Sequence, residues 1–148
     1  MKSLLLAILF ALLTVFFLAQ VGCYPLHSTA RYGNIEELQE LMKGGRDLNK
    51  QDRWGFTPLI SAVYYGHLEA AKTLVEAGAD LNRQDIRGYT ALMYALYYGQ
   101  NPIAEYLVEH GADLSIRDNE YKCTALCFAK YYRNDKLIKL LEEKGAKE

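Results

Sequence analysis

Cysteine is the residue type in this sequence with the widest choice of chemistry. Cys123 and Cys127 are four residues apart. Two thiolates at that spacing make half of a structural zinc site, and in an oxidising compartment they pair as a disulfide if their Cβ atoms approach closely enough. Cysteines are also often simply buried as small apolar side chains. We favour buried free thiols and keep two alternatives: a disulfide, and a thiol-based redox or metal-handling protein that uses this pair.

The histidines do not suggest a catalytic group. His27, His67 and His110 are widely separated along the chain. No pair of residues has a spacing typical of nucleophilic or general acid–base catalysis. We therefore expect no catalytic residue, no metal site and no cofactor, and we predict that the protein is not an enzyme.

The composition is that of one folded domain. The chain has 148 residues, of which 51% are hydrophobic and 24% are charged, and only three are proline. This length allows one domain of ordinary size plus a targeting segment. The formal net charge is −1 and there is no Lys/Arg run, so the positive surface expected of a nucleic-acid-binding protein is missing. The twelve tyrosines are the unusual feature, and their positions matter below.

The first 23 residues differ from the rest. Lys2 is followed by an apolar run over residues 4–19, and small residues precede Cys23. This order is typical of a secretory signal. Gly22 and Cys23 also resemble the end of a bacterial lipoprotein signal, in which the cysteine becomes the lipidated first residue of the mature chain. We therefore predict a signal peptide or N-terminal anchor over residues 1–23.

Three outcomes of processing remain open. The chain is lipidated at Cys23, or it is cut nearby to give a soluble periplasmic or secreted protein, or it keeps an uncleaved anchor. All three place the remainder outside the cytoplasm. We expect an exported protein that is periplasmic or anchored to a membrane.

The remainder repeats with a period of 33 residues, and the last copy carries one inserted residue between Asp118 and Thr124. A fixed period of this length is typical of a solenoid of stacked units. The positions that share the register are Gly33, Gly66 and Gly99; Gly45, Gly78, Gly111 and Gly145; Asp47, Asp80 and Asp113; Leu48, Leu81 and Leu114; and Thr57, Thr90 and Thr124.

Each copy predicts two short helices. Thr57 followed by Pro58 is typical of a helix start, because the hydroxyl caps free amides and proline fits the first helical position. Gly66 ends this helix, and a second helix runs over about residues 68–77. Gly88 then supplies a tight turn before the next copy. One such unit cannot bury its apolar face alone, so the units must stack.

These residues resemble the ankyrin repeat. The stretches DRWGFTPL, GHLE and EAGADLN, at residues 52–59, 66–69 and 76–82, match its pattern almost residue for residue. The resemblance implies an all-α solenoid of four helix-turn-helix repeats with hairpin-like turns, over residues 24–51, 52–84, 85–117 and 118–148. In the last copy Arg133 replaces the helix-ending glycine and the outer surface is polar, as a terminal cap requires.

Ankyrin-repeat proteins bind protein or peptide partners on a concave surface of turn tips and first helices, and the resemblance implies the same here. Pairs of tyrosines share one register in that region. Tyr, Trp and Arg are the residues that most often carry binding energy at interfaces. The candidate partner-binding residues are Tyr32, Arg53, Trp54, Phe56, Tyr64, Tyr65, Arg87, Tyr89, Tyr97, Tyr98, Tyr131 and Tyr132.

The alternative for any one of these tyrosines is packing between neighbouring repeats. Tyr94 and Tyr106 fall outside the register, and we predict that both are packing residues. The sequence thus predicts an exported, noncatalytic interaction module with an aromatic-rich concave face. It leaves the identity of the partner and the oligomeric state open.

Overall fold

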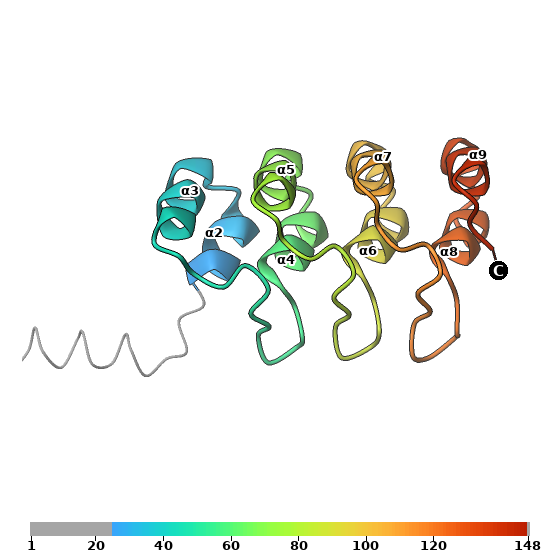
Figure 1. Ribbon diagram of the computed structural model, residues 1–148. Helices are drawn as coiled ribbons and strands as arrows, with labels where there is room; N and C mark the ends of the chain where they lie inside the picture. Colours follow the sequence, from blue (N-terminus) through green and yellow to red (C-terminus); the bar gives the residue numbers. More distant parts are fainter. Residues whose placement is uncertain (1–24, 148) are drawn as a thin grey trace, which may run out of the picture.

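The computed structural model describes residues 25–147, and the expected signal or anchor, with Cys23, lies outside this range. Over these residues the chain forms eight α-helices and no strand (Figure 1). The predicted all-α repeat solenoid is confirmed. The helices are α2 (Pro25–Tyr32), α3 (Ile35–Lys43), α4 (Pro58–Tyr64), α5 (Leu68–Glu76), α6 (Ala91–Tyr97), α7 (Asn101–Glu109), α8 (Ala125–Tyr131) and α9 (Asp135–Glu143).

The helices lie in two parallel rows. Helices α2, α4, α6 and α8 form the inner row, and α3, α5, α7 and α9 form the outer row (Figure 1). Each inner helix contacts its neighbours in the inner row and the outer helix that follows it in the chain. Three long loops project from the inner row on the side away from the outer helices (Figure 1). Each repeat is therefore one helix pair, and α4, α6 and α8 are each preceded by a loop.

Local capping explains where the inner helices begin and end. The hydroxyl of Thr57 accepts a hydrogen bond of 3.1 Å from the amide of Ile60, and Thr90 caps α6 in the same way. Gly66, after α4, has a φ of +79°, a left-handed conformation that glycine adopts without steric cost. Arg133 occupies the equivalent position after α8 and has a φ of +55° despite its side chain.

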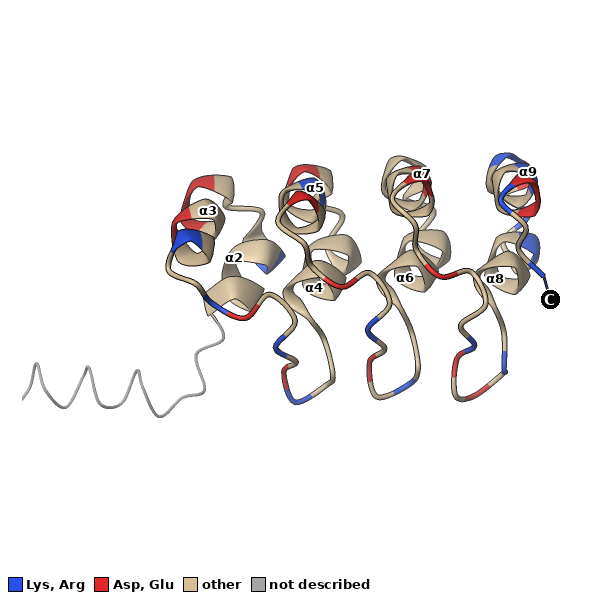
Figure 2. Ribbon diagram, viewed as in Figure 1, with Lys and Arg blue, Asp and Glu red and all other residues tan. Residues whose placement is uncertain are grey.

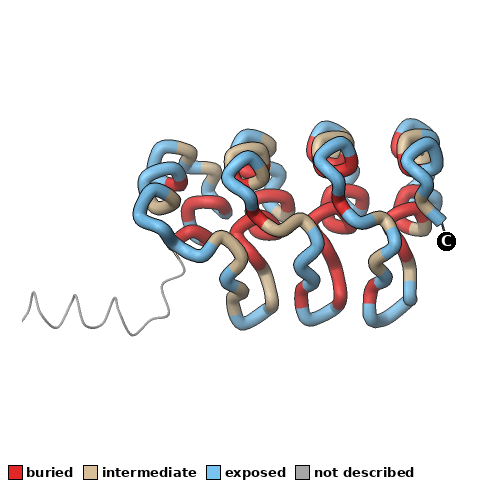
Figure 3. The backbone as a smooth tube through the Cα atoms, viewed as in Figure 1, coloured by how far each residue is buried: buried red, intermediate tan, exposed pale blue. Residues whose placement is uncertain are grey.

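The core lies between the two rows of helices, where the tube in Figure 3 is coloured as buried. Leucines from both rows fill it, and alanines allow neighbouring helices to approach closely. Leu38, Leu59, Leu74, Leu92, Leu107, Leu126, Leu137 and Leu141 are all at most 3% exposed.

The loops stack on one another through backbone hydrogen bonds. The amide of Asn119 donates to the carbonyl oxygen of Arg87 at 2.9 Å, and the amide of Ile86 donates to that of Trp54 at 3.2 Å. The contact is so close that a Cβ on Gly88 would lie 2.6 Å from the backbone nitrogen of Asn119. Glycine at this position is therefore required for the approach as well as for its φ of +82°.

Charged residues lie mainly on the outer helices and the loops, whereas α4 and α6 carry none (Figure 2). Within residues 25–147 no helix has the length and apolar character needed to cross a membrane.

Candidate functional site

Six tyrosines form a continuous row of touching rings, which we call the tyrosine ladder: Tyr64, Tyr65, Tyr97, Tyr98, Tyr131 and Tyr132. Each pair consists of the last residue of α4, α6 or α8 and the residue that follows it. Within the pairs the ring centroids are 5.1, 4.9 and 5.0 Å apart. The sequence register thus becomes one aromatic surface across three repeats.

Contacts between repeats connect the pairs. The centroids of Tyr64 and Tyr98 are 5.2 Å apart, and those of Tyr97 and Tyr132 are 5.4 Å apart. All five contacts of the ladder have steep interplanar angles, from 62° to 79°, and are edge-to-face. This geometry places the positive edge of one ring against the negative face of the next. The ring positions therefore support one another from repeat to repeat.

The first repeat extends the ladder with a cation. The guanidinium carbon of Arg31 lies 4.8 Å from the ring centroid of Tyr65 and 5.8 Å from that of Tyr32. Tyr32 is 72% exposed. Arg31 and Tyr32 lie 33 residues before Tyr64 and Tyr65, so they hold the register of the tyrosine pairs and form the N-terminal end of this surface.

The ladder residues are neither wholly core nor wholly surface. Tyr65, Tyr97, Tyr98 and Tyr132 are between 42% and 44% exposed, so each has one packed side and one free side. Tyr131 is 79% exposed, and among the described residues the one ring it contacts within the ladder is that of Tyr132. Tyr64 is the most packed member, since its ring contacts Phe56, Tyr94 and two ladder tyrosines. Half-buried aromatic rings held by their neighbours present area to a partner at low cost in conformational entropy.

Tyr94 supports the ladder from below. It is 1% exposed, which confirms the prediction that it is a packing residue. Its hydroxyl donates a hydrogen bond of 2.6 Å to Asp85, and it accepts one of 2.5 Å from the guanidinium of Arg87. Burial, followed by the hydrogen bond to Asp85, raises the pKa of Tyr94 well above its usual range. The hydroxyl therefore stays protonated and keeps its role as donor.

Three carboxylates that the sequence analysis did not single out organise the loops. Asp85 accepts backbone hydrogen bonds from Arg87 at 2.9 Å and from Tyr89 at 2.8 Å. Asp52 and Asp118 do the same in their own loops. Their recurrence at steps of 33 residues was the signal in the sequence that could have revealed them. They shape the loops that carry the remaining candidate residues.

The candidate residues of the loops divide into two groups. Trp54 is 54% exposed and stacks beneath the guanidinium of Arg53 at 5.2 Å, so both lie at the surface. Tyr89 is 7% exposed and packs against Phe128 with a centroid distance of 5.3 Å. Phe56 is half-buried and packs against the core. Tyr89 and Phe56, both candidate partner-binding residues, therefore fold back against the inner helices and expose little area at the turn tips.

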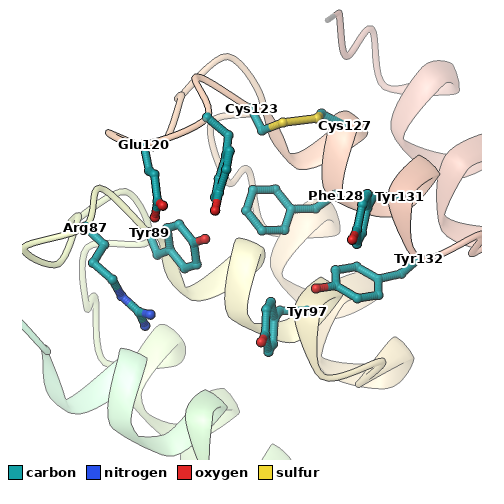
Figure 4. Close-up of a pocket in the computed structure, with 10 residues that line it drawn as sticks. Arg87, Tyr89, Tyr97, Glu120, Cys123, Cys127, Phe128, Tyr131 and Tyr132 are labelled. Carbon is teal, nitrogen blue, oxygen red and sulfur yellow. A yellow bond between two sulfur atoms is a disulfide. The ribbon is translucent and has the colours of Figure 1, made fainter.

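Two cavities lie between the loops and the ladder. The larger has a volume of about 480 Å³ and is shown in Figure 4. Glu120 and Tyr121 of the last loop, Tyr97 at the end of α6 and Tyr132 after α8 contribute to its walls. The other, of about 430 Å³, lies one repeat earlier, and Trp54, Tyr64, Tyr65 and Arg87 contribute to it. Aromatic side chains make up most of the lining of both cavities, and each cavity also has two charged residues, Arg87 with Glu120 in the larger one and Asp85 with Arg87 in the other.

Cys123 and Cys127 form a disulfide, with Cα atoms 5.4 Å apart. The prediction of buried free thiols is therefore wrong, and one of its alternatives holds. The bond joins the end of the last loop to the first turn of α8 and forms part of the wall of the larger cavity (Figure 4). Disulfide sulfurs offer no thiolate to a metal, and no group of three or more His, Cys, Asp or Glu is placed to hold a metal ion within residues 25–147.

The histidines connect repeats through backbone carbonyls. The Nε2 of His27 donates to Phe56 at 2.8 Å, and the Nε2 of His67 donates to Arg31 at 2.9 Å. Burial is the main cause that lowers the pKa of His27. His110 lies against Tyr106, a half-buried residue of α7, with stacked rings 3.8 Å apart. Each described contact of these side chains is structural.

Comparison with known protein families agrees with this architecture. A family model described as "Ankyrin repeats (3 copies)" matches residues 4–85, more than half of the chain. A second, described as "Ankyrin repeats (many copies)", matches residues 74–129. No curated protein matches the chain. Ankyrin repeats are protein-interaction modules and are generally noncatalytic. The helix pairs, the stacked loops and both family matches lead to one conclusion: the chain belongs to the ankyrin repeat family.

Proposed function

We propose that this ankyrin-repeat protein is an exported, noncatalytic module that holds a protein or peptide partner on the tyrosine ladder. The observation that carries the proposal is the unbroken row of six rings with centroids 4.9 to 5.4 Å apart. Tyrosines at such a surface offer apolar area together with a hydroxyl for hydrogen bonding. The rings are held by packing, so binding orders few side chains.

The ladder lies where an extended segment can contact it. On one side it is bordered by the loops that carry Trp54 and Tyr121, both more than half exposed. The ladder itself runs along the C-terminal ends of α4, α6 and α8. A peptide that follows the ladder would cross three repeats and contact both cavities.

Site-specific photo-crosslinking tests this function. A photoreactive phenylalanine analogue at Tyr98, in the middle of the ladder, should form a covalent adduct with one discrete partner in an extract of the native host. The matched control carries the same analogue at Glu109, an exposed position at the end of α7 on the outer row. Adducts that are equal at both positions, or none at Tyr98, would contradict the proposal.

A second experiment measures the contribution of the ladder. Replacing Tyr65, Tyr98 and Tyr132 together by alanine should abolish capture of that partner while circular dichroism shows retained helices. If the folded triple variant captured the partner as well as the wild type does, the proposal that the ladder binds the partner would be contradicted. The alternative, a thiol-based redox or metal-handling function, makes the opposite prediction. In that case a Cys123→Ser, Cys127→Ser variant should lose the redox or metal-handling activity, and the tyrosine variant should keep it.

The N-terminal segment supports the proposal of export. Residues 1–23 have the charge and hydropathy order of a signal or anchor. The intact mass of the native protein from membrane and soluble fractions separates the three outcomes: a chain that begins at a lipidated Cys23, a cut soluble chain, or the full-length chain. A full-length chain found only in the cytoplasm would overturn export.

A further inference from the structure

The two cavities beside the ladder occupy equivalent positions in successive repeats. Trp54, Phe56 and Tyr64 line the first cavity. The residues 33 positions later, Arg87, Tyr89 and Tyr97, line the second. On the opposite wall the equivalence continues, but the charge changes sign. Arg87 stands there in the first cavity, and Glu120, again 33 residues later, stands there in the second.

The second cavity also has walls that the first one lacks. Cys123 takes the place that Phe56 and Tyr89 hold in the preceding repeats, and a disulfide there is smaller than an aromatic ring. The inserted residue of the last loop accompanies Tyr121, whose ring stands at the rim. The rings of Tyr97, Tyr131 and Tyr132 form the remaining walls of this cavity (Figure 4). The result is a pocket of about 480 Å³ with tyrosines on several sides.

Glu120 is the acidic residue that lines this pocket. Within residues 25–147 it forms no ion pair. Its carboxylate does interact with Tyr121, and hydrogen bonding to Glu120 raises the pKa of that phenol. Arg87 also lines the pocket, but its charge is offset by the buried carboxylate of Asp85, 3.7 Å from its Nε. The balance of unpaired charge at the pocket is therefore negative.

We propose that this pocket, the tyrosine cage around Glu120, receives a basic side chain, lysine or arginine, of the peptide held by the ladder. The inference rests on the proposed function and names the chemistry of one anchor residue. Aromatic faces attract cations, and a carboxylate beside them adds direct charge complementarity. An aliphatic side chain would cover the carboxylate without satisfying it. An anionic side chain would be repelled by the carboxylate of Glu120. Arg87 would not offset this repulsion, because its guanidinium already interacts with Asp85 and Tyr94.

The test uses the full chain with its tyrosines labelled by carbon-13 and capped single amino acids as probes. N-acetyl-lysine-N-methylamide and its arginine counterpart should produce saturable shifts of the ring signals of Tyr97, Tyr131 and Tyr132. The norleucine counterpart, which keeps the aliphatic stem and lacks the charge, and the glutamate counterpart should bind at least about threefold more weakly.

Variants at the carboxylate decide the role of charge. Glu120 is exposed, so Glu120→Gln should fold normally and raise the Kd for the lysine probe by about threefold or more. Glu120→Arg reproduces the charge of the neighbouring cavity and should abolish lysine binding. Glu109→Gln, the same chemical change on the outer row, should leave the Kd unchanged.

Four results would contradict the proposal that the tyrosine cage binds a basic side chain. These are saturable binding of norleucine equal to that of lysine, preferential binding of glutamate, absence of shifts with every probe, or an unchanged Kd in Glu120→Gln. None of these depends on a natural partner. Failure of the cage would leave crosslinking at Tyr98 intact, whereas failure of the ladder itself would remove that adduct.

Discussion

The hydroxyl of Tyr94 donates a 2.6 Å hydrogen bond to Asp85, nine residues earlier, and so ties the base of the aromatic surface to the loop beside it. The same carboxylate accepts the backbone amides of Arg87 and Tyr89. Asp85 therefore fixes the turn of the loop and holds the ring of Tyr94, against which Tyr64 and Tyr98 pack. The Tyr94 hydroxyl also accepts a hydrogen bond from the guanidinium of Arg87, so Asp85 orients that side chain as well.

Removing that hydroxyl should destabilise the fold. Tyr94→Phe leaves a buried carboxylate with one partner fewer, so we expect the free energy of unfolding to fall by about 1 to 2 kcal/mol. Tyr131→Phe, the same change at a side chain that is 79% exposed, should stay within about 0.5 kcal/mol of the wild type. Urea unfolding followed by circular dichroism measures both, and equal effects would contradict a special role for Tyr94.

The stacking of the loops should appear in a pair of glycine variants. Gly88 and Gly99 both have positive φ, +82° and +65°. A Cβ at Gly99 would meet no atom within 4 Å, whereas one at Gly88 would meet the backbone of Asn119 at 2.6 Å. We expect Gly99→Ala to cost about 1 kcal/mol from backbone strain alone and Gly88→Ala to cost about 2 kcal/mol or more. If chemical unfolding gave the same loss for both, close loop stacking would not be required for stability.

Arg133 offers a stabilising substitution. It holds a φ of +55° at a position where the preceding repeats have glycine. Arg133→Gly should raise the free energy of unfolding by about 0.5 to 1 kcal/mol, because relief of strain exceeds the added entropy of the unfolded chain. Arg133→Ala keeps the Cβ and should bring no such gain. A thermal melt in which the glycine variant unfolds first would show that the side chain of Arg133 contributes more than its strain costs.

The disulfide between Cys123 and Cys127 should stabilise the last repeat. For so short a loop, the chain-entropy estimate is about 2 kcal/mol. A reductant should therefore lower the stability of the wild type by up to that amount and leave a Cys123→Ser, Cys127→Ser variant unaffected. Mass spectrometry after alkylation of the unreduced protein provides the direct check. Alkylation of both residues without prior reduction would show that the bond is absent.

His27 should make stability depend on pH. Burial lowers the folded-state pKa of His27 below the usual histidine value of 6.5. As the pH falls, this histidine therefore takes up a proton in the unfolded chain before it does so in the folded protein. The contribution of the neutral ring is fully present above about pH 6.5 and is lost as the pH drops toward the folded-state pKa. In His27→Gln the loss of stability between about pH 7.5 and about pH 5 should be smaller. Identical pH slopes in urea unfolding would assign the dependence to other groups.

Much of the architecture is predictable from local patterns. Thr57 and Thr90 cap the helices that their sequence positions predict, and Gly66 ends α4 in the left-handed conformation expected of it. These outcomes depend on residues within one turn of each other, so a 33-residue pattern is enough to find them. The burial of Tyr94 also follows from its place outside the register of the ladder.

The candidate site is less accessible to such reasoning. Tyr89 and Tyr121 both lie in loops, yet Tyr89 is 7% exposed and Tyr121 is 67% exposed. The difference arises because Tyr89 packs against Phe128 of the next repeat, whereas no described helix pair packs on the loop that carries Tyr121. Contacts between copies, which a repeat pattern does not specify, decide which aromatic side chain is free.

The sequence by itself determined the repeat, its helix boundaries and the register that places tyrosines in pairs, because these are consequences of short-range capping, turn geometry and apolar periodicity. The tertiary structure alone decided that the pairs join into one ladder, that Asp85 and Tyr94 meet, that Cys123 and Cys127 are bonded, and that Arg87 and Glu120 occupy equivalent cavities. These relationships depend on the rotation and spacing between stacked repeats and on side-chain rotamers, which are set by packing across the stack.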